Sequence, residues 1–278
     1  ITFDPHPAAV LGHEPPVLLT TVGERIDLMA ELGVDVVVVF PFTEDVVHTP
    51  AADFIEDLCR YLHLAELWVG QDFTLGYERG GDIGFLRRFG PKRGFGVRVV
   101  EPVEWKGMVV HSSRVRAALK RGDVEEATGC LGRPYRLSGV VVHGRGIGQD
   151  IGVPTANISP PPNRLVPASG VYACWARTER WGRFPAATNI GTRPTFAENA
   201  QGLTVEAHLL EFDRDLYDRV LGLDFVARLR DERTYPTLNA LVAQLRKDIA
   251  QTRTLLSEEG TDVRESPRAR RSAQLSNR

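Results

Sequence analysis

The stretch HGRGIGQDIGVPTAN occupies residues 143–157 and directly follows a strand-like run at 137–142. Its glycines, Gly144, Gly146, Gly148 and Gly152, let the backbone adopt positive φ values and bring several N–H groups close to one anion. The stretch therefore predicts a phosphate-binding loop, with a flexible hairpin loop as the alternative.

Two oxygen-bearing side chains, Thr155 and Asn157, end this stretch. They are two residues apart, so in an extended segment both point to the same face. A hydroxyl and an amide oxygen on one face suit Mg²⁺, which keeps most of its waters and takes its charge balance from substrate phosphates. We therefore expect a metal-bound phosphate to meet the glycine loop here.

Short, alternating, β-branched runs lie on both sides of this stretch. They are broken by proline and glycine, and they cover residues 137–142, 171–177, 184–190, 203–210 and 221–229. Strands at this spacing predict a small antiparallel barrel. A helix with one apolar face over residues 238–249 follows, and we expect it to pack against the barrel.

The run TVEAHLL at residues 204–210 alternates in polarity. Val205 and Ala207 share one face, which leaves Glu206 and His208 on the other. A carboxylate on a rigid strand is well placed for proton transfer, so Glu206 is a candidate general base; an exposed polar strand face is the alternative. By contrast, Arg230-Asp231-Glu232 has the pattern of a charged surface turn.

The N-terminal half alternates helix-like and strand-like patterns. Helices are predicted to start near Thr21, Pro50 and Asp82, and strands are predicted at 34–40, 67–70 and 97–100. A run that is apolar at nearly every position, such as 34–40, is typical of a parallel strand buried on both faces. This alternation predicts a doubly wound α/β sheet.

Ligands of such sheets bind beyond the carboxyl ends of the strands, so polar segments after strands are candidate sites. One is residues 70–82, with Asp72 and Phe73. Another is HSSRVR at 111–116, where Ser112 and Ser113 cap a helix start and Arg114 and Arg116 follow, a combination that suits a polyphosphate. Each segment also fits a turn, a cap or a solvated helix face.

Composition limits the class of protein. The net charge of −2 gives no basic field and disfavours nonspecific nucleic-acid binding. No apolar run approaches about 20 residues, so no membrane span is predicted. The three cysteines, Cys59, Cys130 and Cys174, lack metal spacing, which favours buried thiols in a reducing cytoplasm. The chain starts at Ile1 within a strand-like run and without a signal peptide, so we expect the true N-terminus further upstream.

At 278 residues the chain is long for one core, so two domains are expected. A short helix after Asp123 ends near Gly132-Arg133-Pro134, which is the predicted boundary. The prediction is an α/β domain at 1–132, a barrel domain at 133–256 and a charged, disordered tail at 257–278.

Residues 152–157, 189–196 and 204–210 resemble the bifunctional bacterial riboflavin kinase/FMN adenylyltransferase family, also called FAD synthetase. The resemblance implies a six-stranded barrel that transfers the γ-phosphate of ATP to the 5′-hydroxyl of riboflavin. It also implies that Thr155 and Asn157 hold Mg²⁺ and that the loop from Gly144 to Gly152 covers the nucleotide phosphates. Glu206 would be the base on the ribityl hydroxyl, and Arg230 would lie near the isoalloxazine. Phosphoryl transfer needs mainly alignment, charge neutralisation and one base, which agrees with these residue types.

The N-terminal half resembles the adenylyltransferase module of that family, a nucleotidyltransferase-type α/β domain that joins FMN to the AMP part of ATP. Residues 1–7 match its Thr-Phe-Asp-Pro-His-Pro segment, and residues 70–82 match its presumed flavin loop. Residues 111–116 match its Ser-Ser-Thr-x-Ile-Arg signature, except that His111 replaces the first serine and Ser113 replaces the threonine. The resemblance places the first strand and a Gly/His nucleotide motif upstream of Ile1. A polypeptide that begins at Ile1 is therefore expected to lose FAD synthesis, whereas the complete protein is expected to have both activities.

Two functions of other classes also fit parts of the chain. One is a noncatalytic flavin-binding barrel in which Glu206 is structural. The other is a nucleic-acid-binding barrel, which the acidic balance and the lack of a combined basic and aromatic stripe disfavour. We expect small-molecule substrates and neither nucleic-acid nor membrane partners; the sequence does not indicate an oligomeric state.

Overall fold

The computed structural model describes the whole chain except residues 145–147, 149–150, 193–202 and 260–278. The chain divides into an N-terminal unit, residues 1–16 and 22–110, and a barrel unit, residues 17–21 and 111–278. This division differs from the predicted boundary after residue 132. The reason is that the second of the two helices preceding the barrel packs on its strands and the first packs on the second, so both belong to the barrel's compact unit.

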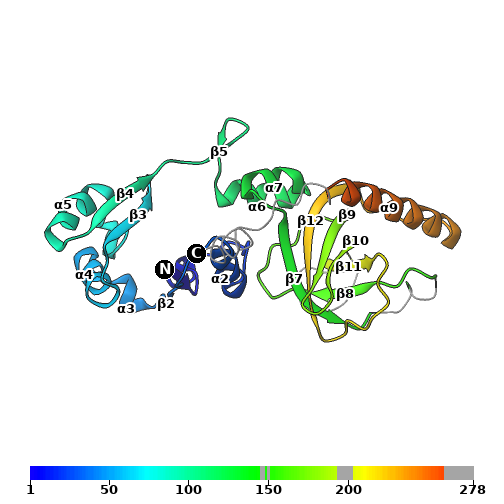
Figure 1. The fold of residues 1–278 in the computed structure, drawn as a ribbon, viewed down its shortest axis with the longest axis horizontal. Coiled ribbons are helices and arrows are strands. Elements are labelled where there is room, and N and C mark those ends of the chain that lie inside the picture. Colours follow the sequence, from blue (N-terminus) through cyan, green and yellow to red (C-terminus); the bar gives the residue numbers. More distant parts are fainter. Residues whose placement is uncertain (145–147, 149–150, 193–202, 260–278) are drawn as a thin grey trace, which may run out of the picture. The chain divides into compact units, whose positions relative to one another are not determined.

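The N-terminal unit alternates short strands and helices (Figure 1). Its elements in chain order are β1 (Thr2–Asp4), α1 (Pro7–Val10), α2 (Val22–Glu31), β2 (Val39–Pro41), α3 (Glu44–Val47), α4 (Ala51–Leu62), β3 (Glu66–Gly70), the 3₁₀ turn η1 (Tyr77–Arg79), α5 (Ile83–Arg93), β4 (Gly96–Val100), β5 (Glu104–Trp105) and β6 (Met108–Val109).

Its main strands pair in parallel, as the α/β prediction requires. β1 pairs with β2 and β3 with β4, which gives two separate two-stranded sheets, while β5 and β6 form an antiparallel hairpin. The predicted cap of α5 is confirmed, because the Asp82 side chain accepts a hydrogen bond from the Phe85 N–H at 2.6 Å. The core consists of Ile55, Leu58, Val69, Leu86 and Phe95.

The predicted strand at 34–40 is wrong over most of its length. β2 begins only at Val39, and Val36 is 74% exposed. Among the described residues β2 is hydrogen-bonded to β1 alone. An apolar run is buried on both faces only where neighbouring elements cover both, and this neighbourhood supplies too little cover.

In its described residues, the barrel unit contains two short helices, six strands and a long C-terminal helix. Its elements are α6 (Ser112–Arg121), α7 (Val124–Leu131), β7 (Tyr135–Val142), β8 (Ala156–Ser159), β9 (Gly170–Thr178), β10 (Gly182–Thr192), β11 (Leu203–Leu209), β12 (Val220–Arg230) and α9 (Leu238–Glu259).

The six strands close into an antiparallel barrel in the order β10-β11-β8-β7-β12-β9. The five predicted runs are all strands, and the sixth strand, β8, is the segment that carries Asn157. The predicted alternation on β11 is confirmed: Val205 and Ala207 are buried, whereas Glu206 is half-buried. Helix α9 packs against β9 and β10 and continues to Glu259, so residues 257–259 are helical rather than part of a tail.

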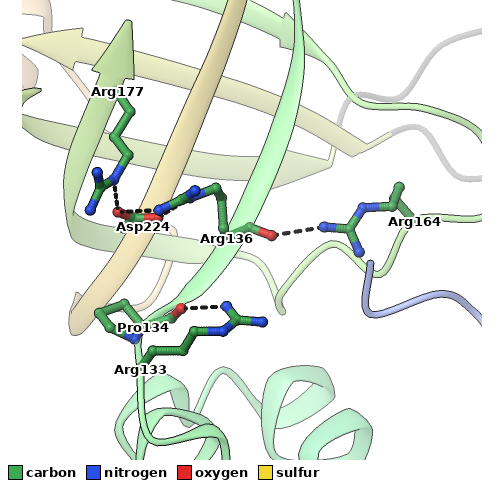
Figure 2. Close-up of polar contacts among 6 residues, drawn as sticks. All are labelled: Arg133, Pro134, Arg136, Arg164, Arg177 and Asp224. Atoms are coloured by element: carbon green, nitrogen blue, oxygen red, sulfur yellow. Dashed lines mark hydrogen bonds and ion pairs between the residues drawn. The ribbon is translucent and has the colours of Figure 1, made fainter. Parts of the chain in front are cut away.

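A buried carboxylate joins three neighbouring barrel strands (Figure 2). Asp224 on β12 accepts a hydrogen bond from Arg136 Nε on β7 at 2.6 Å and pairs with Arg177 on β9. The guanidinium of Arg164 donates to the Arg136 carbonyl at 2.7 Å. A buried charge is tolerated where it is paired and hydrogen-bonded, so this cluster stabilises the register of the strands.

No helix in the described ranges is long and apolar enough to cross a membrane. Cys130 and Cys174 are buried as predicted, while Cys59 is half-buried.

Candidate active site

Three polar residues lie in one row across neighbouring barrel strands. Glu206 on β11 is in register with Asn157 on β8 and with Asn189 on β10. Directly opposite residues of an antiparallel pair have Cβ atoms about 4.5–5.5 Å apart and share a face of the sheet. The row therefore places a carboxylate between two amide side chains.

Two of the predicted glycines allow the backbone to lie against the predicted Mg²⁺ ligands. A Cβ on Gly144 would lie 2.1 Å from the side-chain nitrogen of Asn157, and one on Gly148 would lie 3.2 Å from Thr155 Oγ1. The Val153 N–H also donates to the Gly148 carbonyl at 2.8 Å. Gly152 has φ +74° in an exposed turn, and Gly146 lies outside the described residues.

A first cavity of about 270 Å³ gathers four predicted site residues: Gly148, Thr155, Glu206 and Arg230. Asn189 and His208 also line it, and helix α9 closes one side with Leu241, Leu245 and Ile249. His208 is held by its ring Nδ1, which lies 2.8 Å from the Pro154 carbonyl oxygen. The cavity therefore combines a carboxylate, neutral oxygens and an apolar wall, as a binding site for a partly apolar substrate requires.

The arginine of this cavity is held in place by a buried ion pair. Arg230 Nη2 lies 2.7 Å from Asp248 Oδ2 and Nε lies 3.0 Å from Asp248 Oδ1, and the Asp248 residue is 2% exposed. Gln244, one turn earlier on α9, donates to Asp248 Oδ1 at 2.8 Å. Hydrogen bonding to Asp248 raises the pKa of Arg230 above its usual range. Arg230 is therefore a fixed positive charge at the cavity wall.

The predicted surface turn at 230–232 differs from the structure at Arg230, which ends β12; Asp231 and Glu232 are exposed, and Arg230 and Glu232 line the cavity. Glu232 lies against the barrel: its Oε2 accepts from the Thr192 N–H at 3.4 Å, and a Cβ on Gly191 would lie 2.3 Å from its Oε1. Tyr235 and Asp248 are further lining residues that were not predicted. The sequence could have indicated Asp248, because this charged residue falls on the helix face that is apolar at 241 and 245.

A second cavity of about 430 Å³ lies beside the first and shares Thr155 with it. Pro154, Ala156 and the loop at 212–217 complete its wall. Tyr217 of that loop stacks on His143, the first residue of the glycine-rich stretch, with ring centres 3.9 Å apart. Thr155 is therefore positioned to contact ligands in both cavities.

The N-terminal unit has an aromatic cavity of about 460 Å³ lined by Phe3, Phe42, Phe54 and Phe73. Of the two residues predicted here, Phe73 lines this cavity, whereas Asp72 is exposed and does not. The loop at 70–82 is docked on the start of α4: Tyr77 N–H donates to the Thr49 carbonyl at 2.8 Å, and a Cβ on Gly76 would lie 2.5 Å from the Ala51 backbone.

The signature at 111–116 lies in the barrel unit, so the structure does not bring it into one compact unit with Asp72 and Phe73. Ser112 and Ser113 are the first residues of α6 and His111 is its N-cap, which corrects the prediction that the serines are the caps. Arg114 Nε donates to Glu126 on α7 at 3.0 Å. Arg116 donates to the Val17 carbonyl at 2.7 Å and to Ser112 Oγ at 3.0 Å. Both guanidinium groups therefore stabilise the barrel unit.

The donor set near Glu206 suits a hard cation that shares its ligands with a substrate. In the part of the chain that the structure describes, no three His, Cys, Asp or Glu side chains are grouped to hold a metal ion. Thr155 and Asn157 offer neutral oxygens beside one carboxylate, and Mg²⁺ takes such ligands together with water and phosphate oxygens.

Comparisons with known proteins cover both units. Residues 131–256 match the riboflavin kinase family and residues 1–114 match the FAD synthetase family. A bifunctional riboflavin kinase/FMN adenylyltransferase from Pseudomonas fluorescens is 35% identical over 256 residues, which are 92% of this chain and 81% of the relative. The protein of that description from Escherichia coli K12 is 36% identical over 248 residues, 88% of this chain and 78% of the relative.

A solved structure described as a macrolide-efflux protein from Streptococcus pneumoniae matches this fold with a TM-score of 0.81 at 28% identity, covering 91% of this chain and 82% of that chain. The fold, the sequence relatives and both family matches agree across nearly the whole chain. The chain therefore belongs to the bifunctional riboflavin kinase/FMN adenylyltransferase family.

Proposed function

We propose that Glu206 is the general base of the riboflavin kinase reaction, in which the γ-phosphate of ATP passes to the 5′-hydroxyl of riboflavin. Riboflavin kinase and FAD synthetase are the two activities of this family, and the chain matches both. The observation that carries the assignment of Glu206 is its place at the wall of the first cavity, in register with Asn157 and Asn189.

The roles of the surrounding residues follow from what they line. Riboflavin occupies the first cavity with its ribityl chain toward Glu206, whose carboxylate accepts the proton of the attacking hydroxyl. ATP occupies the second cavity, so that its phosphates reach Thr155, which lines both. Thr155 and Asn157 would hold Mg²⁺, which would supply positive charge against the phosphates, and the backbone at Gly144 and Gly148 would cover the same phosphates.

For the FAD synthetase step, the aromatic cavity of the N-terminal unit is the proposed place of the FMN ring system, with Phe73 in contact with it. Aromatic side chains pack against a flat ring with large buried area at little loss of side-chain freedom. Roles in phosphate binding stay predictions for Ser112, Ser113 and Arg116. For Arg114 such a role requires that it also keep or exchange its bond to Glu126.

The test is a comparison of wild type with Glu206→Gln after incubation with riboflavin, ATP and Mg²⁺, with chromatography of FMN and FAD. We expect FMN formation to fall at least about 100-fold, because the variant cannot accept the hydroxyl proton. Riboflavin binding should persist. Glu211→Gln is the matched control, since the Glu211 side chain is 80% exposed and pairs only with an exposed Arg253 among the described residues.

A second substrate separates the two activities. When FMN is supplied to the complete protein in place of riboflavin, Glu206→Gln should form FAD at the wild-type rate, because this carboxylate belongs to the kinase step alone. Wild-type-like FMN formation by Glu206→Gln would contradict the assignment. Riboflavin binding without ATP consumption in the wild type would instead support the noncatalytic flavin-binding barrel.

A further inference from the structure

Tyr235 has a buried hydroxyl at the wall of the first cavity. It lies between β12 and α9, and its Oη is shielded from solvent without a hydrogen-bond partner among the described residues. Buried polar groups in native proteins are nearly always paired, because an unpaired one costs free energy that folding does not recover. Because Tyr235 lines the cavity, whatever fills the cavity is the candidate partner of this hydroxyl.

Arg230 brings hydrogen-bond donors beside Tyr235, while carboxylates also line the cavity. The guanidinium carbon of Arg230 lies 5.8 Å from the centre of the Tyr235 ring. Three of the five N–H groups of Arg230 are directed to Asp248 and to the Asp231 carbonyl, and the other two have no partner among the described residues. The Asp248 carboxylate is already occupied by Arg230 and Gln244. This part of the wall therefore suits a ligand edge that carries acceptors.

Riboflavin has such an edge. Its ring system is apolar at the dimethylbenzene end and carries two carbonyl oxygens at the pyrimidine end. The first cavity offers both kinds of lining, with the apolar side chains Leu241, Leu245 and Ile249 from α9 and the donors of Arg230 and Tyr235. Matching apolar to apolar and donor to acceptor orients the ring in one way.

We infer that Tyr235 determines flavin specificity in the kinase site, its hydroxyl donating a hydrogen bond to a carbonyl oxygen at the pyrimidine end of riboflavin. This inference rests on the proposed function of the first cavity. A site built to hydrogen-bond a substrate group rejects analogues that lack it, because its own buried polar group is then left unpaired.

Tyr172 supplies the matched control. Its hydroxyl is also buried, but it donates to the Ala168 carbonyl at 2.6 Å within the folded protein, and burial raises its pKa to about 12. Removing the Tyr172 hydroxyl breaks a bond that the unliganded protein has. Removing the Tyr235 hydroxyl breaks none there, so the two substitutions by phenylalanine separate folding from binding.

The experiment is a fluorescence titration of riboflavin against the full chain with MgADP present, together with thermal melts without flavin. Tyr235→Phe should bind riboflavin about five-fold more weakly, as expected for one lost hydrogen bond, with a melting temperature no lower than that of the wild type, because the hydroxyl that it removes is unpaired in the unliganded fold. Its kcat for FMN formation should stay near wild type. Tyr172→Phe should show the reverse, a lower melting temperature and unchanged riboflavin affinity.

Analogues identify the partner atom. Replacing a pyrimidine carbonyl oxygen of riboflavin by sulfur, a weak acceptor, should abolish the difference between wild type and Tyr235→Phe, whereas altering the dimethylbenzene end should preserve it. Equal riboflavin affinity of wild type and Tyr235→Phe would overturn the inference and leave the proposed function standing. Absence of riboflavin binding by the wild type would overturn both.

Discussion

The two units position their candidate sites by different means. In the barrel unit, strand register alone places Asn157, Glu206 and Asn189 in one row, although they are far apart in sequence. In the N-terminal unit, the parallel pairs are short, and Phe73 reaches its cavity from a loop that packs on α4. A closed sheet fixes side chains through backbone hydrogen bonds, whereas a loop depends on individual packing contacts.

Their ion pairs differ in the same sense. The carboxylates of Asp224 and Asp248 in the barrel unit are 6% and 3% exposed. In the N-terminal unit, the pairs Arg93–Glu56 and Arg98–Glu66 have every side chain at least 37% exposed. Hydrogen bonding to Arg98 lowers the pKa of Glu66, which shows that the pair forms, not that it stabilises the fold. The comparison predicts that the barrel unit holds its site residues more precisely than the N-terminal unit and that its ion pairs contribute more to the free energy of unfolding.

The largest effect is expected for Gly144→Ala. Its new Cβ would lie 2.1 Å from the Asn157 amide, so the loop or the Asn157 side chain must move. A displacement of about 1 Å at a reacting site costs on the order of 100-fold in rate, and we expect that loss in kcat/KM for FMN formation. FAD formation from supplied FMN should not change.

Gly23→Ala is the matched control for this prediction. A Cβ on Gly23, in α2 of the N-terminal unit, meets no atom within 4 Å, so the variant should retain both activities. If Gly144→Ala formed FMN at the rate of Gly23→Ala, the glycine loop would not be held against Asn157 during turnover, and the contrast between the units would lose its strongest support.

A smaller, two-part effect is expected for Asp248→Asn. The substitution leaves Arg230 charged without its partner, and breaking a buried ion pair destabilises a fold by about 3 kcal/mol. Arg230 would also lose its fixed orientation, which should raise the KM for riboflavin about ten-fold. The kcat should change less, because Arg230 binds substrate whereas Glu206 accepts the hydroxyl proton. Urea unfolding followed by the fluorescence of Trp175 and Trp181, in a chain with Trp68→Phe and Trp105→Phe, reports the barrel unit alone.

The two parts of that prediction can fail separately. An unchanged KM with lower stability would make Asp248 only an anchor for α9. Unchanged stability would contradict the view that the barrel unit depends on its buried ion pairs. Glu211→Gln, which breaks an exposed pair in the same unit, should leave both quantities at their wild-type values.

Local pattern was sufficient for the features that depend on neighbours in sequence. The period of two on β11 predicted which face carries Glu206, and the cap at Asp82 followed from a helix-start pattern. The shared face of Thr155 and Asn157 stays a prediction. The site residues of the kinase half could be recognised because each lies on, or next to, a strand whose pattern is clear.

Features that depend on distant partners were not predictable in this way. The apolar run at 34–40 has the composition of a buried strand, but burial requires neighbours that a local pattern does not specify. Arg114 was predicted to bind phosphate because it follows two serines at a helix start. Its bond to Glu126 was not visible in that pattern, since Glu126 lies on another helix. Arg230 ends the last strand and Glu232 and Tyr235 follow it as an ordinary charged turn would, and the packing of α9 on β9 and β10 makes them a cavity wall.

The smallest effect is expected for Glu56→Gln, which breaks the Arg93–Glu56 pair in the N-terminal unit. Both side chains are close to half exposed, so water replaces most of what each loses, and we expect the free energy of unfolding to change by less than about 0.5 kcal/mol. Urea unfolding followed by Trp68 and Trp105, with Trp175→Phe and Trp181→Phe, reports this unit. A loss above about 1 kcal/mol would mean that exposed pairs stabilise this unit as buried pairs stabilise the barrel. The difference between the units would then lie in how they hold their sites and not in their stability.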